Sequence, residues 1–322
     1  MKTNTVAVLE PGYSNYKIET AVLEHHNANI AIVTEQEDAV SSLSRLDPVA
    51  VMVRERTVSA AEMDSCPNLR VIVRYGVGVD NIDLDLARSR GIYVANVPDY
   101  GAEVEVSEHA IALYLAVQRR IVERDAEVRQ GKWGIGEAAT IYGRNNAVLG
   151  LIGCGRIGLQ AARKFKALGF AHLLAADPFL DRDIAEAEGI EIVDIDTVCM
   201  QADVISLHAP LTPKTRHMIN ADRIALFKET AILVNVSRGG LVDEVALAKA
   251  LSEGRLFGAG IDVFEQEPIH KDNPLLTCPR TVISDHTAWY SERSLGILKQ
   301  NAALEIDRVL RDDPPKNWVN KW

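Results

Sequence analysis

The chain has 322 residues, of which 47% are hydrophobic and 25% charged, with a formal net charge of −10 at pH 7; this predicts a globular protein with room for two domains. The acidic balance argues against a nucleic-acid partner, because a phosphate backbone binds a basic face. The four cysteines are scattered and form no Cys-x-x-Cys pair, which predicts reduced thiols and no metal site. The sequence contains no apolar run of membrane-spanning length, and its first residues do not resemble a leader. We therefore expect a cytoplasmic protein without membrane contact.

The first third of the chain alternates short apolar runs with helical patterns, which is typical of a parallel α/β sheet. Helical patterns span residues 17–26 and 84–90, and Gly91 is typical of the residue that follows a helix. The expected strands are residues 6–9, 30–33, 49–53, 71–73 and 92–95.

A longer helical pattern, residues 103–130, separates this sheet from the rest of the chain. It follows the turn-forming sequence Pro98-Asp99-Tyr100-Gly101, so we expect a domain junction here and one continuous helix after it. The second half repeats the alternation and closes with a helical pattern over residues 291–311. Its expected strands are residues 147–152, 173–176, 204–207, 232–236, 259–263 and 282–284.

The first strand of the second half runs directly into the turn Gly153-x-Gly155-x-x-Gly158. A helical pattern, a second strand and Asp177 follow, and parts in this order are typical of the dinucleotide-binding βαβ unit. Gly153 allows the tight turn, Gly155 the approach of the pyrophosphate, and Gly158 the close packing of the helix on its strand. The phosphates are expected at the helix N-terminus, where unpaired N–H groups favour an anion.

Asp177 also selects the cofactor. It lies 19 residues after Gly158, the spacing at which a carboxylate accepts hydrogen bonds from the adenosine ribose hydroxyls and repels a 2′-phosphate. The next residues are Pro178 and Phe179 rather than an arginine. The sequence therefore predicts NAD rather than NADP.

Polar residues at the strand ends are the site candidates, because an open parallel sheet binds ligands beyond the carboxyl ends of its strands. Arg238, Glu267 and His286 each follow an expected strand. A histidine can exchange a proton with a substrate oxygen, a carboxylate can hold its imidazole, and an arginine can bind a carboxylate and polarise a neighbouring carbonyl. Each residue alone is commonly structural or a surface charge, but together beside a nucleotide turn they predict hydride transfer at a carbonyl.

Several segments of the chain resemble the D-isomer-specific 2-hydroxyacid dehydrogenases, from about residue 51 to the C-terminus. Residues 286–292 and 316–321 look most like the C-terminal-binding-protein branch of that family. The matching segments are the substrate loop (73–83), the crossover (96–98), the nucleotide turn (149–158), the signature (233–244), and residues 262–268 and 286–289.

The resemblance implies two Rossmann-like or flavodoxin-like domains with parallel sheets, the first discontinuous in sequence. The implied substrate-binding domain comprises residues 1–98 plus 289–322, and the implied NAD-binding domain comprises residues 99–288. The resemblance also implies a homodimer built around the long helix after Gly101.

The same resemblance implies Arg238, Glu267 and His286 as the catalytic set, and backbone amides of Val77 and Gly78 as the groups that hold the substrate carboxylate. Asp262 is expected near the nicotinamide amide. With the strand-end residues His208 and Ser237 included, the expected cofactor site is Gly153, Gly155, Arg156, Ile157, Gly158, Asp177, His208, Pro210, Thr215, Val236, Ser237 and Asp262.

The chain departs from the family pattern in two places. Ser284-Asp285 stands where Thr-Pro usually precedes the histidine, so an extra carboxylate either acts on His286 or faces solvent. The crossover after Asn96 is slightly longer, and Ala102 replaces a frequent serine or threonine, which puts one cofactor or substrate contact in doubt.

Two functional classes remain open at this point. The first is an NAD-dependent enzyme that interconverts a 2-keto acid and a D-2-hydroxy acid; the second is an NAD(H)-sensing binding protein similar to the C-terminal-binding proteins. The complete set of arginine, glutamate and histidine favours the enzyme.

The candidates for substrate contact lie mainly in the first domain. Two cations at its strand ends, Arg54 and Arg74, would suit a second anionic group such as a phosphate or phosphonate, or each pairs with a nearby Asp or Glu. Trp289 could instead cap an apolar side chain. The full set is Arg54, Arg74, Tyr75, Val77, Gly78, Tyr100 and Trp289.

Overall fold

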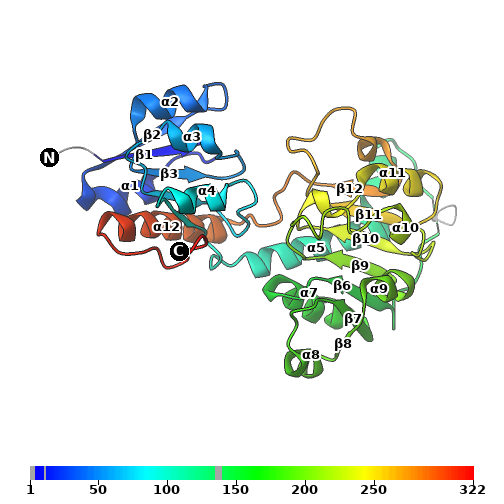
Figure 1. Ribbon diagram of the computed structural model, residues 1–322. Coiled ribbons are helices and arrows are strands. Elements are labelled where there is room, and N and C mark those ends of the chain that lie inside the picture. The colour runs from blue at the N-terminus through cyan, green and yellow to red at the C-terminus, as the bar shows by residue number, and fades with distance from the viewer. Residues whose placement is uncertain (1–3, 11, 135–139) are drawn as a thin grey trace. The chain divides into compact units, whose positions relative to one another are not determined.

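The computed structural model describes residues 4–10, 12–134 and 140–322, and the chain divides into two compact units. Unit 1 comprises residues 1–101 and 291–322, and unit 2 comprises residues 102–290. Each unit has its own sheet with helices packed against it (Figure 1). No helix in the described ranges is long and apolar enough to cross a membrane.

Unit 1 contains a five-stranded parallel sheet with the order β2-β1-β3-β4-β5. This is the flavodoxin-like order, in which the winding reverses between β1 and β3. The strands are β1 (Asn4–Leu9), β2 (Ala28–Val33), β3 (Ala50–Val53), β4 (Val71–Arg74) and β5 (Tyr93–Ala95). The helices between them are α1 (Lys17–Leu23), η1 (Glu24–His26), α2 (Ala39–Leu46), α3 (Ala60–Asp64) and α4 (Leu84–Ser89).

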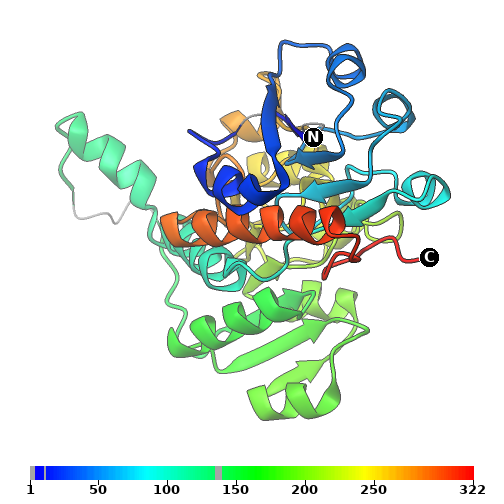
Figure 2. The same cartoon turned by 90° about the vertical axis from the view of Figure 1, so that its left-hand side faces the viewer.

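The end of the chain completes unit 1. Helix α12 (Glu292–Leu310) is capped by Ser291, whose hydroxyl accepts from the Ser294 N–H, and it packs against α1 and β4 (Figure 2). His26 Nε2 lies 2.8 Å from Asp307 Oδ1, which attaches η1 to this helix. Beyond it, Trp318 pairs antiparallel with Ala95 and so covers the edge strand β5. Both ends of the sequence are therefore needed to build this unit.

Unit 2 contains a seven-stranded parallel sheet with the order β12-β11-β10-β9-β6-β7-β8. The winding reverses between β6 and β9, as in a Rossmann sheet, so both predicted sheet types are confirmed. The strands are β6 (Val148–Ile152), β7 (His172–Ala176), β8 (Ile190–Ile192), β9 (Val204–Leu207), β10 (Ile232–Asn235), β11 (Gly258–Ile261) and β12 (Thr281–Ile283). The helices are α5 (Ala102–Arg119), α6 (Ile121–Arg129), α7 (Arg156–Ala167), α8 (Arg182–Glu188), α9 (Ile195–Gln201), α10 (Ala221–Ile224), α11 (Glu244–Ser252), η2 (Gly239–Leu241) and η3 (Pro274–Thr277).

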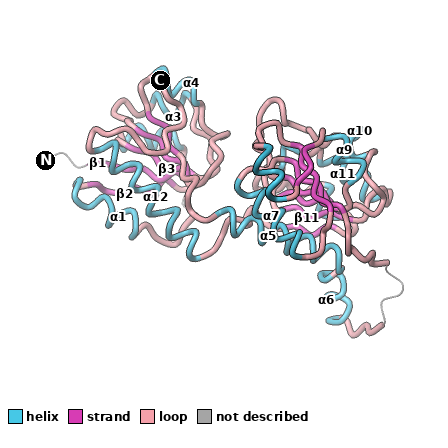
Figure 3. Tube along the Cα trace, turned by 90° about the horizontal axis from the view of Figure 1, so that it is seen from below, coloured by secondary structure: helices cyan, strands magenta, loops and turns pink. Residues whose placement is uncertain are grey.

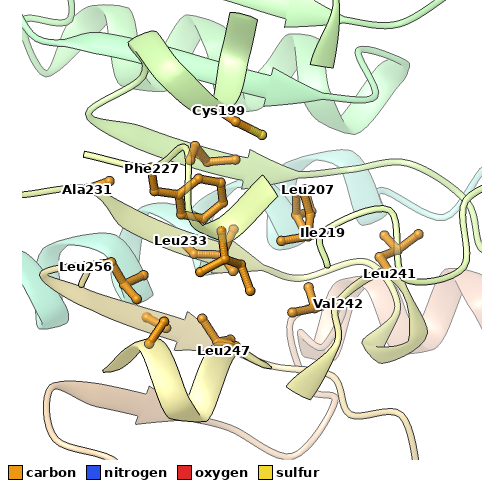
Figure 4. Close-up of a cluster of buried hydrophobic side chains, with 14 of the residues drawn as sticks. Cys199, Leu207, Ile219, Phe227, Ala231, Leu233, Leu241, Val242, Leu247 and Leu256 are labelled. Atoms are coloured by element: carbon orange, nitrogen blue, oxygen red, sulfur yellow. The ribbon is translucent and has the colours of Figure 1, made fainter. Parts of the chain in front are cut away.

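A buried hydrophobic cluster fixes the middle of this sheet (Figure 4). Leu207 of β9 and Leu233 of β10 are fully buried and belong to the same cluster as Phe227, Leu247 and Leu256. Strands covered on both faces consist almost entirely of apolar residues, which explains why β9 and β10 could be recognised in the sequence. The cluster holds the strands in register, and so places the loops that follow them.

The prediction of one helix over residues 103–130 is wrong. The helix breaks at Arg120, which adopts a left-handed backbone with φ of 55°. Its guanidinium turns onto the first turn of α6, where Nε donates to Glu123 Oε2 at 2.6 Å. Helix α5 packs against β10, β11 and α7, whereas α6 buries no residue. The apolar spacing thus continues past the point where the packing surface ends.

The sequence also predicts six strands in unit 2, and β8 is missed. It is a short edge strand in which Ile190 is buried and Ile192 is exposed. With Glu191 between them the sequence alternates apolar and polar, but the burial does not alternate, and three residues are too few to distinguish the strand from a loop.

Candidate active site

The glycine turn after β6 has the close packing that its sequence predicts. Gly153 has φ of +85°, and a Cβ there would lie 2.5 Å from the backbone nitrogen of Ala209. A Cβ on Gly158 would lie 2.5 Å from the carbonyl oxygen of Gly153. A Cβ on Gly155, in contrast, would have no atom of the described residues within 4 Å, its two chain neighbours left aside. The turn is therefore tight beneath and open on the side where a pyrophosphate would approach.

Helix α7 starts at this opening. Its N-cap is Gly155, and no side chain caps it. The first N–H groups of a helix have no partner inside the helix, and they carry the positive end of its dipole. This N-terminus therefore fits a phosphate group.

Asp177 stands directly after β7, beside the turn. Its Oδ2 accepts from the Cys154 N–H at 2.7 Å and its Oδ1 accepts from the Phe179 N–H at 2.8 Å. These bonds fix the carboxylate, and each oxygen keeps a lone pair for a ribose hydroxyl. The turn, the helix and this carboxylate together fit NAD.

The loop after β9 lies against the same turn and contains His208. The His208 Nε2 lies 2.9 Å from Ser206 Oγ, and burial lowers the pKa of the ring to about 4, so the imidazole is uncharged at neutral pH. Thr215 Oγ1 donates to the Pro210 carbonyl at 2.7 Å, and Ser237 Oγ donates to the Ala209 carbonyl at 2.6 Å. These bonds order the loop, and its predicted contacts with the cofactor stay predictions.

His286 and Glu267 form a hydrogen-bonded pair. His286 Nδ1 lies 2.6 Å from Glu267 Oε2, and the two side chains are 21% and 26% exposed. Partial burial raises the pKa of Glu267, but the hydrogen bond and charge of His286, the Phe264 N–H and the charge of Arg238 outweigh it, so the pKa lies below its usual value. Glu267 is therefore ionised at neutral pH and can stabilise a protonated imidazole.

The backbone at His286 is strained and is held by Asp262. His286 has φ of 57°, a left-handed conformation that costs roughly 1–2 kcal/mol for a non-glycine residue. Its N–H donates to the Asp262 carbonyl at 2.8 Å. The Asp262 carboxylate, fully buried, accepts from Ser284 Oγ at 2.6 Å and from the N–H groups of Thr287 and Ala288. These bonds hold the loop, and the predicted nicotinamide contact of Asp262 stays a prediction.

Arg238 follows β10 on a turn that Asn235 holds. Asn235 Nδ2 donates to the Arg238 carbonyl at 2.9 Å, and its Oδ1 accepts from the Ser237 N–H at 3.1 Å. β10, β11 and β12 are neighbouring parallel strands, so Arg238 and Glu267 follow adjacent strand ends, and the charge of Arg238 helps to lower the pKa of Glu267. Within unit 2 the carboxyl ends of β10, β11 and β12 thus bring together the arginine, the glutamate and the histidine.

Trp289 and Asp285 flank the histidine. Trp289 Nε1 donates to the His286 carbonyl at 3.0 Å, so the indole lies against the histidine loop. Asp285 is exposed and accepts from Thr287 Oγ1 at 3.0 Å. Of the two interpretations of this extra carboxylate, the solvent-facing one fits the structure.

In unit 1 the two candidate arginines both pair with glutamates. Arg74 is 6% exposed, and its Nη2 donates to Glu55 Oε1 at 2.8 Å. Arg54 Nη2 lies 3.6 Å from Glu10 Oε1, and its side chain is 34% exposed. The alternative in which each cation pairs with a nearby acid is therefore the one observed.

The remaining candidates of unit 1 differ in exposure. Tyr75 is buried, and its hydroxyl donates to Glu19 Oε1 at 2.9 Å. Val77 is exposed and Gly78 is half-buried on the loop after β4, and Asn96 Nδ2 donates to the Val77 carbonyl at 2.6 Å. The amides of Val77 and Gly78 remain the predicted carboxylate contact.

Sequence reasoning missed several residues that hold the catalytic loops. Asn235 could have been noticed, since it is a polar residue that ends an otherwise aliphatic buried strand. His109 Nε2 on α5 lies 2.8 Å from Ser284 Oγ. The Glu244 carboxylate accepts from the Glu265 N–H in the loop that contains Glu267. These last contacts join residues far apart in the chain, so no local pattern could predict them.

Comparison with known proteins assigns this arrangement to a family. Residues 111–288 match the family model described as D-isomer specific 2-hydroxyacid dehydrogenase, NAD binding domain. The chain is 42% identical over 278 residues to D-3-phosphoglycerate dehydrogenase of Methanocaldococcus jannaschii, a match that covers 85% of this chain and 52% of that protein. It is 40% identical over 270 residues to glyoxylate reductase of Korarchaeum cryptofilum, covering 82% of this chain and 80% of that protein.

Solved structures agree with these matches. D-lactate dehydrogenase from Aquifex aeolicus, complexed with NAD and lactic acid, superposes with a TM-score of 0.86 at 28% identity over 96% of each chain. The chain spans about half the length of the phosphoglycerate dehydrogenases that it matches. The family model confirms the NAD-binding domain that the glycine turn predicts. The chain belongs to the D-isomer specific 2-hydroxyacid dehydrogenase family.

Proposed function

We propose that the protein is an NAD-dependent D-2-hydroxyacid dehydrogenase that interconverts a 2-keto acid and a D-2-hydroxy acid. The observation that carries this proposal is the hydrogen-bonded pair of His286 and Glu267, with Arg238 nearby, at the carboxyl edge of the NAD-binding sheet. When bound, NADH supplies the hydride, and the side chains of this chain handle the proton and the charge.

His286 is the proton donor to the carbonyl oxygen during reduction, and the acceptor in the reverse reaction. Its Nδ1 is engaged by Glu267, so Nε2 is the nitrogen that exchanges the proton with substrate. The ionised Glu267 stabilises the imidazolium before transfer and fixes the orientation of the ring. Asp262 holds the backbone that presents the ring.

Arg238 is the electrophilic group. A guanidinium presents a planar fork that can bind the substrate carboxylate and polarise the adjacent carbonyl. The backbone amides of Val77 and Gly78 in unit 1 are proposed as further contacts of that carboxylate.

The side chain of the substrate is less constrained. The similar proteins are named for phosphoglycerate, glyoxylate and lactate, so side chains of different size and charge are candidates. Arg54 is the more exposed of the two unit 1 arginines, and we propose it as the contact for an anionic side chain. Arg74 is buried with Glu55 and is the weaker candidate.

A steady-state assay tests the proposed class. NADH oxidation is followed with glyoxylate, pyruvate, hydroxypyruvate and phosphohydroxypyruvate in turn. Turnover with at least one of them supports the enzyme. NADH binding without turnover of any 2-keto acid would support the NAD(H)-sensing alternative, which the named dehydrogenases and reductases do not favour. Placement in the C-terminal-binding-protein branch stays a prediction.

NADH is expected to bind well and NADPH poorly. Asp177, fixed beside the glycine turn by two N–H groups, would face the 2′-phosphate of NADPH at close range. Fluorescence titration with both cofactors measures this preference. Asp177→Ala removes the repulsion and is expected to reduce the difference between the affinities for NADH and NADPH. The matched control is Asp183→Ala, at an exposed position on α8. Equal affinities for the wild type would contradict the role of Asp177.

We propose that the protein forms a homodimer through α6 and the residues around it. This helix projects away from the rest of unit 2 (Figures 2 and 3). Ile121, Val122 and Val128 on it are more than half exposed, and Trp133 just after it is 91% exposed. Apolar side chains gathered on one projecting helix are typical of a surface that a partner covers.

Sedimentation measurements are expected to give a dimer for the wild type. Val122→Asp is expected to shift the monomer–dimer equilibrium toward the monomer. Val245→Asp on α11 is the matched control, because Val245 is 71% exposed on a helix packed within unit 2. A monomeric wild type, or equal effects of the two substitutions, would contradict this interface.

A further inference from the structure

We propose that Glu244 is a positioning residue for the catalytic pair: its carboxylate clamps the segment of residues 264–273 and thereby sets Glu267 against His286. The inference rests on the proposed function, because Glu267 and His286 act in that reaction. Glu244 itself contacts neither His286 nor Arg238 in any interaction described for it.

The clamp consists of two hydrogen bonds to one buried carboxylate. Glu244 is the first residue of α11 and is 9% exposed. Its Oε1 accepts from the Glu265 N–H at 2.6 Å, and its Oε2 accepts from Asn273 Nδ2 at 2.5 Å. Glu267 lies between these two attachment points in the sequence. An acidic residue in a first helical turn is usually exposed and interacts with the dipole, whereas burial with two donors on separate oxygens indicates a structural bond to the loop.

Asn273 joins the clamp to the next element. Its Oδ1 accepts from the Leu275 N–H at 3.0 Å and so caps η3, while its amide group reaches Glu244. The far end of the segment is thus fixed both to α11 and to the start of η3.

The near end of the segment touches the loop that carries Arg238. A Cβ on Gly239 would lie 1.8 Å from the Phe264 carbonyl carbon and 2.2 Å from the Glu265 nitrogen. Only a glycine fits against that backbone, so the residue after Arg238 packs directly on the residues that precede Glu267. The Glu265 nitrogen in this contact also donates its hydrogen to the Glu244 carboxylate. The same carboxylate therefore helps to fix the distance between the Arg238 loop and the Glu267 loop.

The side chains of Glu265 and Glu267 make further contacts that fix the segment. His217 Nε2 lies 2.9 Å from Glu265 Oε1, and Arg216 pairs with the same carboxylate. Inside the segment, Glu267 Oε1 accepts from the Phe264 N–H at 2.9 Å. This leaves Oε2 to meet His286 Nδ1, so the position of that oxygen follows from the position of residues 264 and 265.

A carboxylate is required at position 244 because both of its oxygens accept. Glu244→Gln has one oxygen and one NH₂ group, so the NH₂ group faces a donor, either Asn273 Nδ2 or the Glu265 N–H. Asn273→Asp has the opposite defect, with two carboxylates facing each other. The double variant restores complementarity, since the glutamine oxygen accepts from Glu265 and its NH₂ group donates to the aspartate. The aspartate can still cap η3.

Kinetics on these variants test the clamp. We expect Glu244→Gln and Asn273→Asp each to lower kcat by about 10-fold to 10²-fold, as small misplacements in an active site do, and to leave NADH affinity unchanged. The double variant is expected to recover most of the loss. Glu253→Gln, at the exposed end of the same helix, is the matched control and should behave as the wild type.

The pH profile separates positioning from general loss of stability. A displaced Glu267 stabilises the imidazolium less, so the alkaline limb of kcat/KM for reduction should move to lower pH in each single variant and return in the double variant. These substitutions do not change the charges of Arg238, of Asp285 beside the histidine, or of Asp262, whose carboxylate bonds the histidine loop. The His286 ring titration, followed by NMR, should move in the same direction.

The NMR titration does not depend on turnover. A wild type without turnover would contradict the proposed function, while a shifted His286 titration in the single variants would still support the clamp. Single variants with the wild-type titration, or a double variant that does not recover it, would overturn the clamp. If Glu244→Gln does not fold, Asn273→Asp and the double variant still decide the outcome.

Discussion

His286→Ala is expected to lower turnover by roughly 10²–10⁴ while NADH affinity stays near the wild-type value. The substitution removes the imidazole that exchanges the proton with the substrate oxygen. It leaves the glycine turn, the N-terminus of α7 and Asp177 intact, and these groups fit the dinucleotide. The effect should therefore appear in kcat and kcat/KM for the keto acid, measured by NADH oxidation, and be absent from a fluorescence titration with NADH.

His172→Ala is the matched control for this substitution. His172 is an exposed histidine at the start of β7, and its loss should change neither quantity. Near-normal turnover of the His286 variant would show that His286 is structural and that another group transfers the proton.

Arg238→Lys is expected to lower kcat by about 10²–10³ and to raise KM for the keto acid. Lysine keeps the charge but loses the planar fork that can bind a carboxylate and polarise a carbonyl together. The backbone turn at this position should survive, because Asn235 bonds the main chain and not the guanidinium. Cofactor affinity should therefore change far less than the kinetic constants.

Arg255→Lys, on the exposed turn after α11, is the matched control. If KM for the keto acid stays constant in Arg238→Lys and only NADH binding weakens, Arg238 is a cofactor residue. The substrate carboxylate would then depend on the Val77 and Gly78 amides alone.

Much of the fold was predictable because it is encoded locally. The central strands are aliphatic runs, the glycine turn has fixed spacing, and the polar residues at the strand ends follow from the parallel sheet. This is why Arg238, Glu267 and His286 could be selected before any contact was known. The break at Arg120 was not predictable from spacing, since it depends on where the packing surface for α5 ends.

The details of the site depend on tertiary contacts. The pairing of Arg74 with Glu55 and of Arg54 with Glu10 joins different strand ends, so the sequence left it as one of two alternatives. The bonds of Asp262 to the histidine loop likewise depend on the adjacency of β11 and β12. Sequence reasoning thus identified the reacting groups but not the residues that hold them.

The configuration of the product tests the central proposal most directly. The protein is incubated with NADH and a prochiral 2-keto acid that supports turnover, and the hydroxy acid is resolved by chiral chromatography. The proposal predicts the D enantiomer in an amount equal to the NADH oxidised, and a rate of formation roughly 10²–10⁴ lower in His286→Ala. Formation of the L enantiomer, or NADH oxidation without any hydroxy acid, would contradict the assignment of this protein as a D-2-hydroxyacid dehydrogenase.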